Sequence, residues 1–343
     1  MAEARPFTLE DAYLGEDEAA RLLEGRRIRR GDRVMDPKAQ LLGEFIVSLR
    51  PPDQLPTPEE SRVQFRRMVD LFDGPPPESV RTRDLACPGP DGEVPLRLFE
   101  PGNAGDPAPL LLYLHGGGWV QGDLETHHGL CARLSLHGDA LVVAIDYRLA
   151  PEHKFPAGVE DAFAAYRWLR AHGRELGADT TRVAVAGDSA GGNLSAVVSQ
   201  LAASAGLPVP TCQVLIYPAL DASLDTESHR ELADAHVIPR ERIMWYMAQY
   251  LGADADTVDP RVSPLRAKRL AGQPPTMIVT AGFDPLRDEG HAYAEALRRA
   301  GVDVVYREYP GQIHAFVSLT KAIPQGLTCT LEVAEYLRKR LSA

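Results

Sequence analysis

The chain has 343 residues, of which 44% are hydrophobic and 25% are charged, a composition that is typical of globular proteins and argues against disorder, fibrous repeats and coiled coils. Its 48 acidic residues outnumber its 37 basic residues, and the formal net charge of −11 would repel a polyanion, so no nucleic-acid partner is expected. Residues 1–20 do not resemble a secretory signal, no apolar run reaches spanning length and the four cysteines lack CxxC spacing, which favours a cytoplasmic protein without membrane insertion.

The first part of the chain, up to about Asp73, is mostly helical by its pattern. Residues 17–24 are amphipathic, and residues 37–49 carry apolar side chains at helical spacing. Thr57 followed by Pro58 is a typical helix start, because threonine caps the first turn and proline fits within it. We therefore expect several helices before the first long strand.

From about residue 80 onwards, the pattern predicts an α/β fold. Two β-rich runs at 80–87 and 94–99 flank a Gly-Pro-Asp-Gly turn and predict an antiparallel hairpin. Further predicted strands are residues 110–114, 141–145, 183–186, 214–217, 277–280 and 302–309, and the stretches between them include predicted helices at 156–175, 190–205 and 286–300. This alternation indicates a mostly parallel central sheet with helices on both faces.

One segment, residues 219–263, interrupts this alternation. Within it, residues 240–251 have apolar side chains at helical spacing and predict a helix. This insertion and the helices before residue 74 could cover a binding site as a lid, or could pack on the core as peripheral helices. The pattern alone does not separate these two interpretations.

Residues 187–191 read Gly-Asp-Ser-Ala-Gly, a GxSxG pattern between a predicted strand and a predicted helix. A sharp turn at this point would hold the Ser189 hydroxyl clear of its own backbone and beside a base, as a serine nucleophile requires. The helix N-terminus would present the Ala190 amide to developing negative charge. Taken alone, the short pattern is also compatible with a glycine-rich turn or an anion site.

Three consecutive glycines, residues 116–118, follow an apolar strand and His115. Ordering such a loop costs backbone entropy, which favours a loop whose amides must approach a ligand closely. We expect the amides of Gly116 and Gly117 to form an oxyanion hole with that of Ala190. A phosphate cradle is disfavoured because no GxGxxG or Walker spacing follows.

The partners of the serine follow from the chain order serine, acid, histidine. Asp284 comes directly after a predicted strand, at the edge of the sheet where α/β folds bind ligands. His314 follows the next strand on a loop, whereas His291 lies inside a predicted helix. The candidate triad is therefore Ser189, Asp284 and His314, with Asp288 as the alternative acid.

These motifs together resemble the bacterial hormone-sensitive-lipase-like carboxylesterases, which belong to the α/β-hydrolase superfamily. The motifs are HGGGW at 115–119, DYRLAPE at 146–152, GDSAGG at 187–192, DPLRDEG at 284–290 and His314. The resemblance implies the triad and oxyanion hole named above, and a bracing role under the site for Asp146 and Glu152. It also implies an α/β-hydrolase fold with a helical cap.

The family pattern also implies a division of the chain. Residues 1–73 would be an N-terminal extension with cap helices, and residues 74–343 would be the catalytic domain with a cap insertion at about 219–263. The first 33 residues extend beyond the family pattern. We interpret their basic run, residues 26–30, as a solvated helix face.

The resulting prediction is a serine carboxylesterase that works through an acyl-enzyme intermediate. The resemblance favours esters with short to medium acyl chains. The candidate substrate-binding residues are Trp119, Asp188, Trp245 and Tyr246, with Met244 as a further candidate for the apolar wall. The aromatic residues and Met244 could equally be core residues.

No cofactor and no metal are expected, because His127 and His128 lack other ligands at suitable spacing and fit a loop or helix start. An exposed edge strand near the C-terminal end could pair two copies into a homodimer. Two alternative functions stay open. The fold also hosts ligand-binding proteins without the catalytic base, against which His314 counts, and the same triad could hydrolyse lactones or amides.

Overall fold

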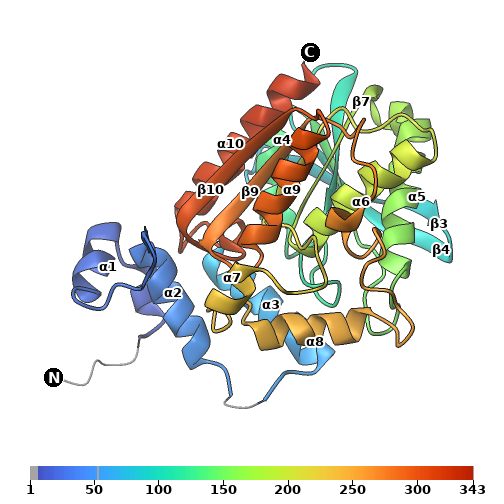
Figure 1. Ribbon diagram of the computed structural model, residues 1–343. Coiled ribbons are helices and arrows are strands. Elements are labelled where there is room, and N and C mark those ends of the chain that lie inside the picture. Colours follow the sequence, from blue (N-terminus) through green and yellow to red (C-terminus); the bar gives the residue numbers. More distant parts are fainter. Residues whose placement is uncertain (1–6, 52–53, 343) are drawn as a thin grey trace.

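The structure is a computed structural model that describes residues 7–51 and 54–342. A mixed eight-stranded sheet forms its centre, with the strand order β10-β9-β8-β7-β5-β6-β4-β3 (Figure 1). The strands are β3 (Arg81–Gly89), β4 (Gly92–Glu100), β5 (Ala108–Leu114), β6 (Leu141–Ile145), β7 (Ala178–Asp188), β8 (Gln213–Ile216), β9 (Thr276–Phe283) and β10 (Val304–Ile313). β4 pairs antiparallel with both β3 and β6, and the other neighbours are parallel. This confirms the predicted fold class.

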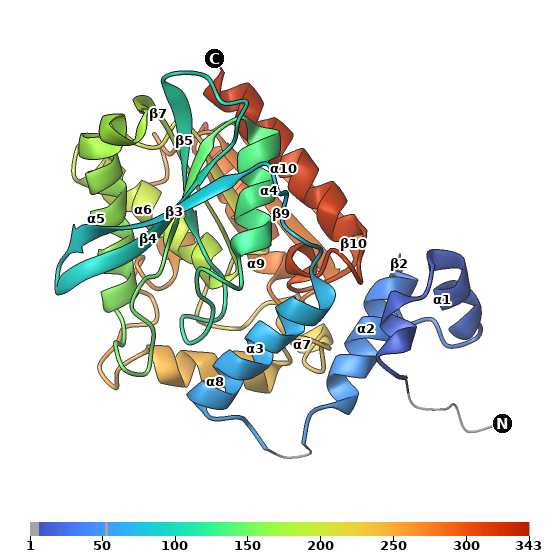
Figure 2. The ribbon, with the colours of Figure 1, turned by 180° about the vertical axis from the view of Figure 1, so that it is seen from behind.

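Helices cover the sheet from both sides, as Figures 1 and 2 show from opposite directions. One face carries α5 (Ala157–His172), α6 (Ala190–Ser204) and α9 (Arg287–Arg299), and the other carries α4 (His128–Gly138) and α10 (Gln325–Leu341). Every residue of β5 is buried as a result. A strand that is covered on both faces needs apolar side chains on both, which explains the unbroken apolar runs in the sequence.

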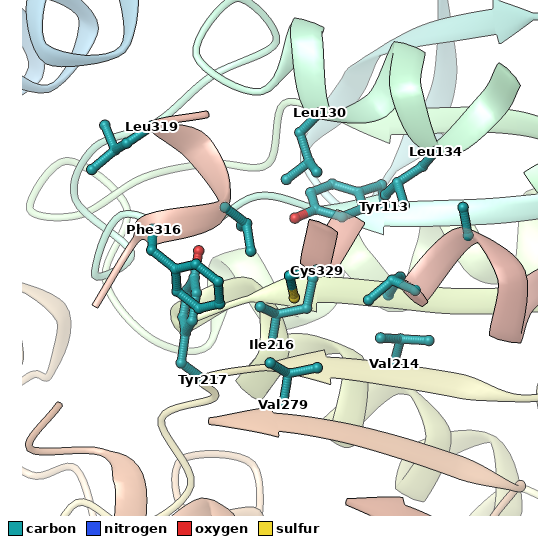
Figure 3. Packing of buried hydrophobic residues seen from close by; sticks show 14 of the residues in the cluster. Tyr113, Leu130, Leu134, Val214, Ile216, Tyr217, Val279, Phe316, Leu319 and Cys329 are labelled. Atoms are coloured by element: carbon teal, nitrogen blue, oxygen red, sulfur yellow. The ribbon is translucent and has the colours of Figure 1, made fainter. Parts of the chain in front are cut away.

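Successive side chains of one strand enter different core clusters. Leu111 belongs to the cluster beneath α4 and α10, whereas Leu110 and Leu112 belong to the cluster beneath α5 and α6, because strand side chains alternate between faces. Figure 3 shows part of the first cluster, which contains Ile216 of β8 and Leu134 of α4. Burial of each such leucine or isoleucine contributes about 1.5–3 kcal/mol relative to exposure.

Four helices lie at the end of the molecule where β7 leads into α6 (Figures 1 and 2). They are α2 (Pro37–Ser48), α3 (Pro58–Phe72), α7 (Glu227–Glu231) and α8 (Arg240–Tyr250). The other helical segments are α1 (Glu16–Leu22) and the 3-10 turns η1 (Glu10–Tyr13), η2 (Gly173–Leu176), η3 (Pro264–Arg266) and η4 (Phe316–Ser318). Within the described ranges, no helix combines the length and apolar character that a membrane span requires.

The predicted start of α3 is confirmed, and an ion pair ties this helix to the body of the protein. The Thr57 hydroxyl accepts a hydrogen bond from the Glu60 amide at 3.2 Å, and the Glu60 carboxylate accepts one from the Thr57 amide at 2.8 Å. Arg62 donates to both carboxylate oxygens of Glu152, at 2.8 and 2.6 Å. This pair braces the loop that contains Glu152, the role that the resemblance implied.

The basic run at residues 26–30 is not a helix face, so that prediction was wrong. Its last two residues form β1 (Arg29–Arg30), which pairs antiparallel with β2 (Arg33–Val34). The chain turns between them at Gly31, whose φ of 58° is readily adopted by glycine but does not continue a right-handed helix. The local turn chemistry therefore outweighs the charge pattern that favoured a helix.

Candidate active site

Ser189 occupies a sharp turn between β7 and α6. Its φ of 54° and ψ of −117° are uncommon for a residue other than glycine and place strain at this point. Backbone hydrogen bonds hold the conformation. The Ser189 amide donates to the Ile216 carbonyl at 2.8 Å, and the Ser189 carbonyl accepts from the amides of Asn193 and Ala219 at 3.0 and 3.2 Å. The strained backbone is thus fixed by the neighbouring strand end and by the helix that it starts.

Two glycines allow this turn to pack closely. A Cβ atom at Gly191 would lie 1.8 Å from the Leu114 carbonyl oxygen, and one at Gly187 would lie 2.4 Å from the carbonyl carbon of Gly191. Both distances are far shorter than van der Waals contact, so the end of β5 and the start of α6 can approach this closely only with glycine. The two glycines of the GxSxG pattern are therefore required for close packing at this turn.

The structure brings Ser189, His314 and Asp284 into one hydrogen-bonded chain. The Ser189 hydroxyl oxygen lies 2.9 Å from Nε2 of His314, and Nδ1 of His314 lies 2.7 Å from Oδ2 of Asp284. Asp284 is fully buried and His314 is 5% exposed. The second carboxylate oxygen of Asp284 accepts a hydrogen bond from the Leu286 amide at 2.9 Å, which fixes the carboxylate plane toward the imidazole.

The alternative acid, Asp288, is engaged elsewhere. Its carboxylate accepts hydrogen bonds from the Ser228 amide and from Nε of Arg287, both at 2.8 Å. These contacts anchor the short helix α7 to the start of α9. His291, the histidine set aside in the sequence, packs its ring edge-on against Tyr306, with centroids 5.4 Å apart.

The glycine loop differs from the prediction at its first member. The Gly116 amide donates to Oδ1 of Asp188 at 2.9 Å, so this amide points to a protein carboxylate rather than to a ligand. The cavity beside the serine is lined instead by Gly117, Gly118 and Ala190. The prediction that the Gly116 amide belongs to the oxyanion hole was therefore wrong. The sequence pattern could not show this, because Asp188 lies 72 residues away.

Asp188, predicted to bind substrate, is almost entirely buried and holds several parts of the protein together. Besides Gly116, its Oδ1 accepts a hydrogen bond from the Tyr113 hydroxyl at 2.8 Å and lies 3.2 Å from Nε2 of His127. Burial alone would raise the pKa of Asp188, but His127 and these donors outweigh burial and lower it. Asp188 borders the cavity, but its carboxylate accepts a hydrogen bond from the glycine loop.

His127 takes the place expected of it, as the cap residue that precedes α4. Its contact with Asp188 was not predicted. His115 is also buried, and its ring stacks on Tyr147 with centroids 4.2 Å apart. Burial lowers the pKa of His115 to about 4, so this imidazole is neutral at pH 7.

A cavity of about 720 Å³ opens in front of Ser189 and His314. Its far wall comes from the end of α2, from α3 and from α8. Trp119 lines it while stacking on Tyr250, with ring centroids 4.4 Å apart. Ile243, Tyr246 and Met247 line it from α8. The volume lies within the usual range for small-molecule sites.

Two of the predicted wall residues lie elsewhere on α8. Trp245 is not among the residues that line the cavity and carries the Arg242 guanidinium 4.4 Å above its ring. Met244 is 53% exposed. Residues three and four apart share a helix face, so the face with Ile243 and Tyr246 turns inward and the intervening residues turn away.

One cavity residue was not predicted to line the site, although it lies within the DPLRDEG motif. Glu289 on α9 is 1% exposed, accepts a hydrogen bond from the Asp221 amide at 2.7 Å and borders the cavity. Burial raises the pKa of Glu289 well above its ordinary value, because an ionised carboxylate is costly away from water. A glutamate on a helix is usually a surface residue, which is why its sequence position alone did not indicate this role.

The described residues contain no cluster of histidine, cysteine, aspartate or glutamate that could hold a metal ion. His128 bonds to Arg97, with Nδ1 and Nη1 3.2 Å apart. The described cysteines are all buried, free thiols. The chemical groups at the end of the sheet are therefore a serine hydroxyl, an imidazole, a buried carboxylate and a set of backbone amides.

The close contact at Gly191 predicts that Gly191→Ala is strongly destabilising, by about 3 kcal/mol, because the new methyl group meets backbone atoms that cannot move aside. Thermal and urea unfolding would measure the loss. Gly138→Ala is the matched control, since its Cβ atom would have 3.8 Å to the nearest atom. Equal stability of the two variants would contradict this account of the turn.

The raised pKa of Glu289 predicts a stability that depends on pH. Because the pKa is raised in the folded protein, the folded state keeps a proton that the unfolded chain releases above about pH 4.3. Folding stability is therefore lost as the pH rises, and Glu289→Gln, which cannot ionise, removes that loss. We expect the variant to gain more in melting temperature at pH 8 than at pH 5.

Glu295→Gln is the control for this measurement, because Glu295 lies on the same helix and pairs with Arg298 at the surface, at 2.7 Å. It should show no gain at pH 8. A Glu289→Gln effect that is the same at both pH values would mean that Glu289 is ionised in the folded protein.

Comparison with known proteins places this geometry in a family. A family model described as the alpha/beta hydrolase fold matches residues 111–318. The chain is 46% identical over 288 residues to the carboxylic ester hydrolase LipN of Mycobacterium tuberculosis, covering 82% of this chain and 76% of that protein. It is 38% identical to an ethyl acetate hydrolase of Pseudomonas putida, covering 82% and 90% of the two chains.

Among solved structures, an ester hydrolase from the metagenome of Lake Arreo, complexed with a derivative of bipyridine phosphonate, superposes with a TM-score of 0.86. The two sequences are 40% identical, and the match covers 90% of this chain and 100% of the other. The chain therefore belongs to the hormone-sensitive-lipase-like family of carboxylic ester hydrolases, which have the α/β-hydrolase fold.

Proposed function

We propose that this protein hydrolyses carboxylic esters with Ser189 as nucleophile, His314 as general base and acid, and Asp284 as the residue that orients the imidazole. The observation that carries the proposal is the unbroken chain of hydrogen bonds from the serine hydroxyl to the buried carboxylate, 2.9 and 2.7 Å long. A serine hydroxyl becomes a useful nucleophile only when a base accepts its proton during attack.

The reaction proceeds in two halves. In the first, the Ser189 oxygen attacks the ester carbonyl carbon while Nε2 of His314 takes the hydroxyl proton, and Asp284 stabilises the resulting imidazolium. The C–O bond to the alcohol then breaks, and His314 returns the proton to the leaving oxygen. In the second half, His314 takes a proton from water while the water oxygen attacks the acyl carbon. The bond from that carbon to the Ser189 oxygen then breaks, and His314 returns the proton to Ser189, which releases the acid.

The backbone amides of Gly117, Gly118 and Ala190 are the proposed oxyanion hole. They border the cavity beside the serine, and the Ala190 amide belongs to the first turn of α6, where the helix dipole favours negative charge. Asp188 would act through the loop and not on the substrate. It accepts a hydrogen bond from the Gly116 amide and so sets the orientation of the two glycines that follow.

We assign residues 1–73 and the insertion at about 219–263 to an N-terminal extension and a cap, with residues 74–343 as the catalytic domain. The cavity wall contributed by α3 and α8 supports this assignment. A cavity of about 720 Å³ suits esters with short to medium acyl chains. The relative named for ethyl acetate points to the same range.

A homodimer and a cytoplasmic location remain predictions. The edge position of β10 in the sheet supports the first, because an edge strand has unpaired backbone groups. Part of that edge is already occupied, since the Asp36 amide donates to the Gly311 carbonyl at 2.8 Å and Arg33 binds Glu308 at 2.6 Å. The buried free cysteines support the cytoplasmic location.

Ser189→Ala is the direct test of the proposed chemistry. We expect turnover of a chromogenic short-chain ester to fall by several orders of magnitude, while the melting temperature stays close to that of the parent. Ser204→Ala, at the other end of α6, should keep full activity; its hydroxyl donates to the Gln200 carbonyl at 2.8 Å.

Organophosphate labelling followed by peptide mass mapping gives an independent readout. The adduct should map to Ser189, and a panel of an ester, a lactone and an anilide should be hydrolysed fastest at the ester. An adduct on another residue, or full activity in Ser189→Ala, would overturn the proposed mechanism.

A further inference from the structure

Arg242 is a positively charged group in the cavity wall, and among residues 7–51 and 54–342 no carboxylate pairs with it. It lies on the inner side of α8 and borders the cavity. Its Nη2 donates to the Ser61 hydroxyl at 2.5 Å, and its guanidinium lies 4.4 Å from the ring centre of Trp245 and 4.9 Å from that of Tyr246. These contacts hold the guanidinium in place, but none of them supplies a full negative charge.

A second guanidinium borders the same cavity. Arg50, just after α2, donates to the carbonyls of His236 and Val237. Burial and the nearby charge of Arg242 both lower the pKa of Arg50, as two partly buried like charges would. Within the described residues, neither arginine has an acidic partner at ion-pair distance. Placing two such charges together is unfavourable unless an anion joins them.

The acidic groups of the cavity do not compensate for these charges. Asp221 pairs with Arg266 at 2.7 Å, and Asp188 accepts a hydrogen bond from the glycine loop. Burial raises the pKa of Glu289, which favours its neutral form. Glu60 caps its own helix and Glu241 is exposed at the rim, as is Arg67. Among the cavity residues that the structure describes, the charge without an opposite partner is therefore positive.

The net charge of the whole chain has the opposite sign, −11. Its long-range repulsion of an anion is screened beyond about 8 Å at physiological ionic strength. Guanidinium groups that contact a bound carboxylate act within hydrogen-bond distance, where charge-assisted bonds are strong and geometrically specific. The local arginines, and not the overall charge, should thus decide how the cavity treats an anionic ligand.

We propose that this cavity selects esters that carry a carboxylate on their acyl or alcohol part, which Arg242 and Arg50 bind while the ester carbonyl lies at Ser189. This inference rests on the proposed esterase function and narrows it to a substrate class. Both ends of such a molecule would find their partners in one cavity, because Ser189, Arg50 and Arg242 all line it. The apolar residues between them would contact the connecting chain.

The test compares esters that differ only in charge. Monoethyl adipate and its monoamide have nearly the same shape, and 4-acetoxybutanoate and its amide place the charge in the alcohol part. Hydrolysis of each would be followed in a pH-stat with the full chain. We expect kcat/KM to favour the anionic member of at least one pair by about tenfold or more, mainly through a lower KM.

Arg242→Gln should reduce this preference to within about threefold, because it removes the charge while glutamine can still donate to Ser61. The readout is the ratio of kcat/KM for ester hydrolysis between the two members of each pair, which a general loss of activity does not change. Arg242→Lys keeps the charge and should retain part of the preference. Arg299→Gln makes the same change in net charge on the exposed side of α9 and should leave the preference intact.

The outcomes separate the two proposals. If the parent hydrolyses neutral esters as efficiently as the anionic ones in both pairs, the substrate inference is wrong and the esterase function stands. The inference is equally wrong if Arg242→Gln keeps the full preference. If none of the four compounds nor a chromogenic ester is hydrolysed, and Ser189 takes up no organophosphate label, the proposed function itself fails.

Discussion

The contact between the end of β5 and the first turn of α6 is the constraint on which the site depends. No side chain fits at Gly191, because the Leu114 carbonyl occupies that space. Leu114 is also the register partner of Gly187 in the neighbouring strand. The glycine loop after β5 and the serine turn after β7 therefore leave the sheet side by side. This packing places Ala190, the glycine loop and the strained Ser189 at one cavity.

A single buried carboxylate makes that arrangement rigid. Asp188 lies in the strand that leads to the serine, and it binds the Gly116 amide, the Tyr113 hydroxyl and the imidazole of His127. A buried charge is costly unless it is fully hydrogen-bonded, so the same contacts that stabilise Asp188 also fix the loop. Donors that are fixed before the substrate arrives are the most effective kind for stabilising charge that develops during a reaction.

The helices over the cavity are joined to the loop by a polar chain. Arg242 of α8 donates to Ser61 of α3, and the Ser61 hydroxyl in turn donates to Oε1 of Gln121, which follows the glycine loop. The backbone amide of Gln121 donates to the Gly117 carbonyl at 3.0 Å. The cavity wall and the proposed oxyanion hole are thus parts of one hydrogen-bonded network. The positive charge in that wall is what distinguishes this cavity from a purely apolar one.

Much of the architecture could be predicted from the sequence. Alternating strands and helices, the Thr57 cap and the order of Ser189, Asp284 and His314 are local or topological features, and parallel strands that end at one edge bring the last three together. Gly116, Trp245 and Glu289 could not be placed in this way. The direction of the Gly116 amide depends on a carboxylate 72 residues away. The position of Trp245 depends on how α8 is rotated toward the cavity, and the role of Glu289 depends on complete burial of an ionisable group.

The sequence by itself thus determined the fold class, the chain order of the reactive groups and the glycines that let them approach, because these depend on periodicity and backbone freedom within each element. Only the tertiary structure decided which glycines of the loop line the cavity, which face of α8 lines it and that Arg242 pairs with none of the described carboxylates. Those properties depend on contacts between elements that are distant in the chain, and a local pattern contains no information about which partner a charge or an amide meets.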